Sequence, residues 1–175
     1  MKKTVSLVLA LTMLLCAFVF TSCDSNADND NSPSNADNNN SPSNQTQKEE
    51  EFYNLVDETK ELLDIVADDI YSYWYDCIYN DKYLENIDYA VACAKNDNKE
   101  NLDKIEENTA KIKELYKEVK EGKLGAEAKA VMQAYNDYYT LVVEVSGSFQ
   151  SYSASIETCK KELASTLDDF SFELD

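Results

Sequence analysis

Aromatic residues are the side chains whose number and spacing point most clearly to binding. The chain has twelve tyrosines and one tryptophan. Five aromatic residues fall within nine positions at 71–79, so in a helix they cannot all face one core. Rings with a polar tip suit contacts with a glycan, a peptide or another protein. A wide core with hydroxyls at its rim is the alternative interpretation. The candidate binding patch consists of Tyr71, Trp74, Tyr75, Tyr79 and Tyr139.

The residue types needed for most enzyme chemistry are missing. The chain has no histidine and no arginine, so the commonest general base and metal ligand and the bidentate guanidinium are all lost. Local acid pairs such as Asp64 and Asp68 are interpreted as a solvated helix face, because acids occur along the whole chain. We therefore expect no enzymatic activity, no catalytic residue, no metal and no cofactor.

Charge narrows the range of partners. The chain has 34 acidic residues and a formal net charge of −18. Removal of an N-terminal segment that carries Lys2 and Lys3 would leave 14 lysines and a charge of −20. Such a surface repels nucleic acid, so nucleic acid is not an expected partner.

The N-terminus has the pattern of an export signal. Lys2 and Lys3 precede an almost wholly apolar run over 5–20, which is short for a membrane-spanning helix. Thr21, Ser22 and Cys23 follow, and then polar sequence begins. This pattern resembles the lipobox of bacterial lipoprotein signal peptides, although Phe20 stands where leucine is usual. The resemblance covers residues 1–23 only. It implies a signal peptide at 1–22, lipid on Cys23 and a place on the extracytoplasmic face of the cell membrane.

Residues 23–47 are expected to be a disordered tether after the lipidated cysteine. From residue 24 they contain no aromatic or branched aliphatic side chain, and a nine-residue Asn/Ser-rich unit at 25–33 recurs with one change at 34–42. A segment that buries nothing cannot offset its ordering entropy.

The remaining residues, 48–175, are expected to form an all-α domain. They contain no proline and only three glycines, and their apolar residues recur every three or four positions. With turns at Asn80-Asp81 and at Gly122, taken as a C-cap glycine, the expected helices cover 49–79, 82–121 and 124–172. They would pack as an elongated antiparallel three-helix bundle, or as four helices if residues 96–98 interrupt the second. The step at 146–148 is expected not to break the third, because the apolar stripe keeps its phase through it.

This register makes a prediction about the cysteines. A third helix that climbs from Leu124 returns to the level of Cys77 near residue 159, so Cys77 and Cys159 form the candidate disulfide. Cys93 would lie about 18 Å away along the axis, without a partner. Burial as small apolar side chains explains all three cysteines equally well.

Together these features predict a membrane-anchored extracytoplasmic lipoprotein whose acidic helical bundle is a non-enzymatic interaction or spacer module. Its expected partners are the membrane, through the lipid on Cys23, and a cell-envelope protein or glycan. The alternative is a small-molecule or glycan binding protein that uses the Tyr/Trp cluster.

Overall fold

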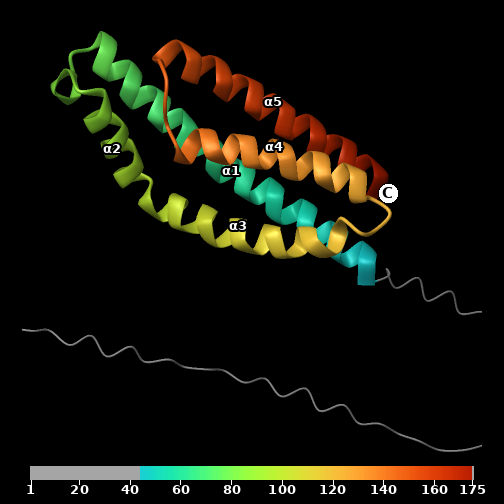
Figure 1. Cartoon of the computed structure of the whole chain (residues 1–175). Coiled ribbons are helices and arrows are strands. Elements are labelled where there is room, and N and C mark those ends of the chain that lie inside the picture. Colours follow the sequence, from blue (N-terminus) through green and yellow to red (C-terminus); the bar gives the residue numbers. More distant parts are fainter. Residues whose placement is uncertain (1–43, 175) are drawn as a thin grey trace, which may run out of the picture. The chain divides into compact units, whose positions relative to one another are not determined.

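The computed structural model describes residues 44–174, and these residues are all-α (Figure 1). No strand occurs among them, which confirms the predicted fold class. The predicted signal peptide, Cys23 and most of the tether lie outside the described residues. The elements are α1 (Asn44–Tyr79), the 3₁₀ turn η1 (Tyr83–Glu85), α2 (Ile87–Asp97), α3 (Lys99–Val119), α4 (Gly125–Val143) and α5 (Phe149–Leu174).

Helix α1 packs against all the other helices. Its 36 residues span about 54 Å at 1.5 Å per residue. It begins at Asn44, so residues 44–47, which the sequence assigned to the tether, are helical. Its buried residues follow at steps of three and four, which gives one stripe toward the core. They include Phe52, Val56, Leu63, Val66, Ile70, Trp74 and Cys77.

Contacts between helices fix their directions. Helix α3 runs antiparallel to α1, since Asn98 bonds Asp69 and Asn108 bonds Thr59. Helix α5 also runs antiparallel to α1, since the ring of Phe170 lies 5.7 Å from that of Phe52 while Phe149 lies beside Trp74. Figure 1 shows α4 returning along α1 in the direction of α1.

The first break follows Tyr79, where the sequence predicted a turn at Asn80-Asp81. Asp81, Tyr83, Leu84 and Glu85 all have φ between 50° and 58°. Residues with side chains avoid this left-handed region, so four of them in five positions is unusual. The turn is closed by backbone bonds from the Glu85 N–H to the Lys82 carbonyl and from the Asn86 N–H to the Tyr83 carbonyl.

The second break is at Asn98, inside the range 96–98 that the sequence left open. Helix α2 ends at Asp97 and α3 begins at Lys99. The buried side chain of Asn98 donates to Asp69 of α1 at 2.7 Å and to the carbonyl of Ala94 at 3.1 Å. A side chain that bonds its own backbone competes with a regular helix, so Asn98 anchors the break to α1.

The single helix expected over 124–172 is wrong. Helix α4 ends at Val143 and α5 begins at Phe149, so the three-helix arrangement is not confirmed. Gly147 has a φ of 88°, which glycine adopts without strain and which no helix continues through. Ser148 caps the new helix, since its hydroxyl accepts from the Ser151 N–H at 3.2 Å and the Ser151 hydroxyl accepts from the Ser148 N–H at 2.9 Å.

The predicted C-cap role of Gly122 is also wrong. Helix α3 ends at Val119 with Lys120 as its right-handed C-cap, and Gly122 is not among the residues with positive φ. The glycine instead lies close to the ends of the flexible Gln45 and Glu49 side chains of α1. A Cβ at Gly122 would lie 2.2 Å from the Gln45 side chain of α1.

Cys77 and Cys159 were predicted to be neighbours, but they lie far apart because the helix breaks before α5. Cys159 precedes Lys160, whose Nζ lies 2.7 Å from Asp68 and 3.7 Å from Asp64. Those acids stand nine to thirteen residues before Cys77 on α1, or roughly 14–20 Å along its axis. A disulfide needs Cα atoms within about 7 Å. Cys77, Cys93 and Cys159 are all free.

Candidate functional site

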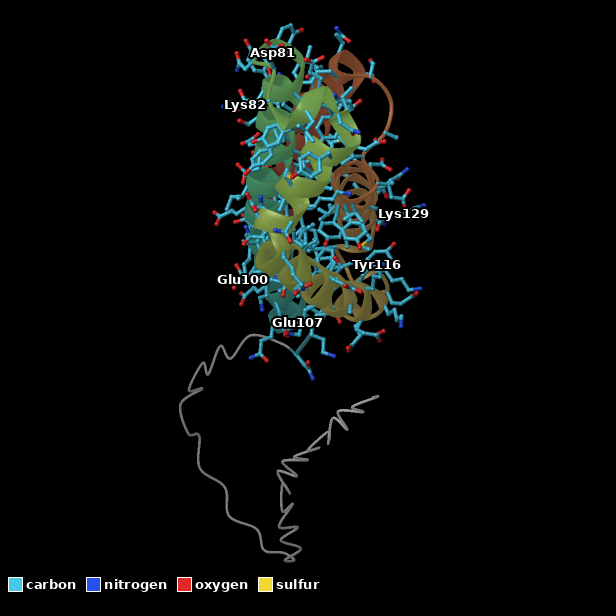
Figure 2. The ribbon with its side chains drawn as sticks, turned by 90° about the vertical axis from the view of Figure 1, so that its left-hand side faces the viewer. Asp81, Lys82, Glu100, Glu107, Tyr116 and Lys129 are labelled. Atoms are coloured by element: carbon cyan, nitrogen blue, oxygen red, sulfur yellow. The ribbon has the colours of Figure 1, made fainter. Side chains whose placement is uncertain are left out.

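The end of the helices farthest from Asn44 exposes most of the apolar side chains. Of the nine large hydrophobic residues exposed in the described part of the chain, seven lie within residues 71–89. Leu84, at the tip, is 86% exposed. Figure 2 shows Asp81 and Lys82 at this end, with Glu107 toward the opposite one. Concentrated exposed apolar surface marks contact sites, whereas single exposed residues do not.

Three predicted patch residues form an open surface on this end. Tyr71, Tyr75 and Tyr79 stand one turn apart on α1 and are all exposed. Each ring contacts Phe149 at the start of α5, with centroid separations of 5.0, 6.2 and 6.1 Å. We call Tyr71, Tyr75, Tyr79 and Phe149 the tyrosine face.

The other two residues of the predicted patch lie elsewhere. Trp74 is only 3% exposed and belongs to the core. Tyr139 is on α4, where it stacks on Tyr135 at 6.2 Å. It borders a cleft between α2, α3 and α4 with Lys95 and Leu102, so it does not join the tyrosine face.

A cleft of about 610 Å³, which we call the tryptophan cleft, opens beside Trp74. Its apolar wall includes Ile87, Val91 and Val145, and its polar groups are Glu85, Asn86, Asp88 and Ser146. The Trp74 Nε1 is buried and has no hydrogen-bond partner among the described residues. A buried donor without a partner is costly to the fold.

The charged side chains that line the tryptophan cleft determine which ligands it could bind. Glu85 and Asp88 supply two carboxylates, and no lysine lines the cleft. Asn86 is already used, since its Oδ1 accepts from the Tyr89 N–H at 3.0 Å and caps α2. An anion would be repelled, whereas a neutral ligand with hydroxyl groups could donate to the carboxylates.

A second hollow lies between α1, the turn and α2. Its volume is about 410 Å³, and we call it the tyrosine groove. Tyr73 and Tyr83 stack with centroids 4.9 Å apart, and the Tyr73 hydroxyl donates to Asp97 at 2.5 Å. This hydrogen bond to a carboxylate, with partial burial, raises the pKa of Tyr73 well above its usual range. The lining is Tyr73, Tyr83, Tyr89, Ala92, Cys93, Asn96 and Asp97.

The acid pairs noted in the sequence have structural partners. Asp64 accepts from the Tyr138 hydroxyl at 2.7 Å and from Lys60 at 3.3 Å, while Asp68 accepts from Lys160. No group of three or more cysteine or acidic side chains that could hold a metal ion occurs within residues 44–174.

The cysteines of α1 and α5 are poorly placed for nucleophilic chemistry. Burial raises the pKa of the Cys77 thiol, and Glu85 adds to the shift. Burial also raises the pKa of Cys159, with smaller contributions from Asp137 and Glu162. A raised thiol pKa means less of the thiolate that reacts.

Several residues of this end were missed by sequence reasoning, namely Tyr83, Tyr89, Phe149, Glu85 and Asp97. Tyr89, Cys93 and Asn96 carry a readable signal, since their spacing of four and three places them on one face of α2. Phe149 carries none, because it occupies an ordinary position in an apolar stripe that was predicted to be continuous.

No family model matches the chain, and no curated protein or solved structure matches it. None of the helices within residues 44–174 combines the length and the apolar character needed to cross a membrane.

Proposed function

We propose that this chain is a membrane-anchored extracytoplasmic lipoprotein whose acidic helical domain is a non-enzymatic interaction module. In this proposal the helices form one antiparallel bundle, with α2 and α3 as a single kinked rod. The lipid on Cys23 anchors the chain. The tyrosine face and Leu84 contact the partner, a protein or glycan of the cell envelope.

One observation carries this proposal: the exposed apolar side chains gather at the end of α1 that is farthest from Asn44. The chain enters α1 at Asn44, so any anchor in the preceding sequence attaches at the other end. An interaction module needs its contact surface on the far end, where a partner can reach it. A simple spacer has no need for exposed tyrosines there.

Photocrosslinking in the native cell envelope tests the proposal. A photoreactive residue is placed at Leu84 in the full chain and, as a matched control, at Phe172. Phe172 is 80% exposed and lies near the other end of the domain. We expect one discrete crosslinked species from position 84 that is absent from position 172, and its loss when Tyr75 and Tyr79 are changed to serine. Equal crosslinking from both positions, or none from position 84, would contradict the proposal.

A second candidate function is binding of a neutral small molecule or glycan in the tryptophan cleft. It is favoured by a cleft of about 610 Å³ whose lining includes Trp74 and two carboxylates. Pockets of this size hold small ligands. Trp74 is the only tryptophan, so its fluorescence reports directly on the cleft. Titration with neutral mono- and disaccharides should shift its emission, and an unchanged spectrum throughout would count against this function.

A further inference from the structure

The tyrosine groove has a composition that neither proposed function uses. On α2, Tyr89, Ala92, Cys93 and Asn96 recur at steps of three and four and form one wall. Tyr73 of α1 and Tyr83 of the turn form the other. The groove thus brings together three phenol rings from three separate elements, with the Asp97 carboxylate at its edge.

The charges around the groove favour a cation. The face of an aromatic ring is the negative part of its quadrupole, so tyrosine rings beside the Asp97 carboxylate attract positive charge. Asp69 adds to the negative potential at Tyr73. No lysine lines the groove, and Lys82, which lies near Tyr83, is held by Asp76 in an ion pair of 2.8 Å.

The form of the cation follows from the size and polarity of the walls. A compact metal ion would need several oxygen ligands, and the groove is lined mainly by tyrosine side chains and the Ala92 methyl group. One Asp97 oxygen already accepts from Tyr73. A cation with an apolar surface loses little hydration when it contacts such walls, and a volume of about 410 Å³ holds a group of several heavy atoms.

The backbone of Tyr83 adds a structural argument. Tyr83 has a φ of 58°, and this left-handed conformation places its ring against that of Tyr73. Strained residues with side chains persist where the surroundings hold them, and they concentrate at ligand sites. Here the Tyr83 carbonyl accepts from the Asn86 N–H at 3.0 Å, which fixes the turn in this form.

We propose that the tyrosine groove is a binding site for a small organic cation of the methylated ammonium class, such as a trimethylammonium group. The rings of Tyr73, Tyr83 and Tyr89 contact the methyl groups, and Asp97 balances the charge. The cation could come as a free quaternary amine or as the headgroup of a larger envelope molecule. This site is separate from the tyrosine face and from the tryptophan cleft, so it does not rest on either proposed function.

Calorimetric titration of the full chain with choline tests the proposal. The matched control ligand is 3,3-dimethyl-1-butanol, which has the same shape without the charge. We expect choline to bind and the neutral alcohol to bind at least about fivefold more weakly, the scale of a cation–π contact. Equal affinities, or no heat with choline, would overturn the proposal.

Substitutions locate the site. Tyr89→Leu removes one ring from a side chain that is 51% exposed, and Asp97→Asn removes the charge while keeping an acceptor for Tyr73. Each should weaken choline binding about three- to fivefold or more. The controls Tyr79→Leu and Asp103→Asn should leave it within about twofold, since neither residue lines the groove. Control variants that weaken binding as much as the groove variants would place the cation elsewhere and overturn the assignment.

Two further experiments identify the source of the cation and test this proposal independently of the proposed function. Phosphocholine and vesicles with phosphocholine headgroups are compared with free choline. Binding of free choline alone assigns the site to a small amine, and binding of the vesicles as well assigns it to a headgroup. The groove variants should keep the Leu84 crosslink, and Tyr75→Ser with Tyr79→Ser should keep choline binding. Failure of one proposal therefore leaves the other standing.

Discussion

Three fully buried tyrosines differ in what their hydroxyls contact. The Tyr135 hydroxyl lies 2.5 Å from that of Thr109, and the Tyr138 hydroxyl donates to Asp64 at 2.7 Å. The Tyr152 hydroxyl has no partner among the described residues. The net value of a buried hydrogen bond is small, whereas a buried polar group without one carries its full desolvation cost. Removal of the hydroxyl should therefore raise the free energy of unfolding at Tyr152 and lower it at Tyr135.

We expect Tyr152→Phe to raise the free energy of unfolding by about 1 kcal/mol, because it removes an unpaired buried hydroxyl and leaves the ring in place. The matched change Tyr135→Phe should lower it by about 1 kcal/mol, because it leaves Thr109 without this contact. Urea unfolding at pH 7 measures both. A loss of stability in Tyr152→Phe equal to that in Tyr135→Phe would show that the hydroxyl of Tyr152 is paired in solution.

The same residues predict alkaline instability. Burial raises the pKa of Tyr135 to about 12 and raises those of Tyr138 and Tyr152 further. Tyrosine in an unfolded chain ionises near pH 10. The stabilisation is therefore complete below about pH 10 and is lost as the pH rises, because the unfolded state then releases protons that the folded state retains.

Above pH 10 each buried tyrosine should lower the free energy of unfolding by up to about 1.4 kcal/mol per pH unit. Urea midpoints between pH 8 and 11 measure this decline. In Tyr152→Phe the decline should be smaller by the contribution of one buried tyrosine. A midpoint at pH 11 equal to that at pH 8 would be incompatible with burial of the three hydroxyls.

At the scale of the elements, the sequence predicted the turn after Tyr79 but not the break before α5. Asn80 and Asp81 are both turn residues and end an apolar stripe. Val142, Phe149 and Ile156 are seven positions apart, a spacing that a continuous helix and two helices joined by a short loop both satisfy. Gly147 was therefore the only local sign of the break. Because the break was not predicted, the position of Cys159 along the bundle axis was also predicted wrongly.

The candidate site was predictable only in part, for similar reasons. Tyr71 and Tyr75 each follow one residue after a core position of α1, and Tyr79 follows two residues after Cys77, so their exposure agrees with the helical pattern. The place of Tyr83 depends on a left-handed turn built from residues that rarely adopt it, and no propensity rule indicates such a turn. Tyr139 was included because of its residue type, and only the packing of α4 assigns it to another surface.

Asn98 gives an element-scale prediction. Asn98→Ala removes a buried side chain that bonds Asp69 and Ala94, so it should lower the free energy of unfolding by about 1–2 kcal/mol. The matched control Asn96→Ala changes an exposed residue two positions earlier and should stay within about 0.5 kcal/mol. Urea unfolding compares the two. Equal small effects would mean that the break between α2 and α3 does not depend on the anchor to α1.

At the scale of the whole molecule, the acidic side chains are spread widely, whereas the exposed apolar side chains are concentrated. The chain has a net charge of −18, its acids occur along all the helices, and most of the ion pairs are exposed and contribute little each. The exposed apolar residues gather at one end. A uniformly acidic surface resists non-specific association with anionic lipid, so contact at the apolar end becomes selective. In the proposed function, attachment to a membrane comes from the lipid on Cys23.

The last prediction concerns that anchor. Cys23→Ser should abolish incorporation of labelled palmitate and release the chain from the membrane fraction, because the serine cannot form the thioether that carries the lipid. Each buried methylene stabilises membrane attachment by about 0.8 kcal/mol, so two acyl chains hold the chain firmly and their loss leaves nothing comparable. The matched control Cys93→Ser should keep both the label and the membrane location. A wild-type chain without label, or a labelled Cys23→Ser variant, would disprove lipidation at this residue and leave the aromatic end without its proposed orientation toward a partner.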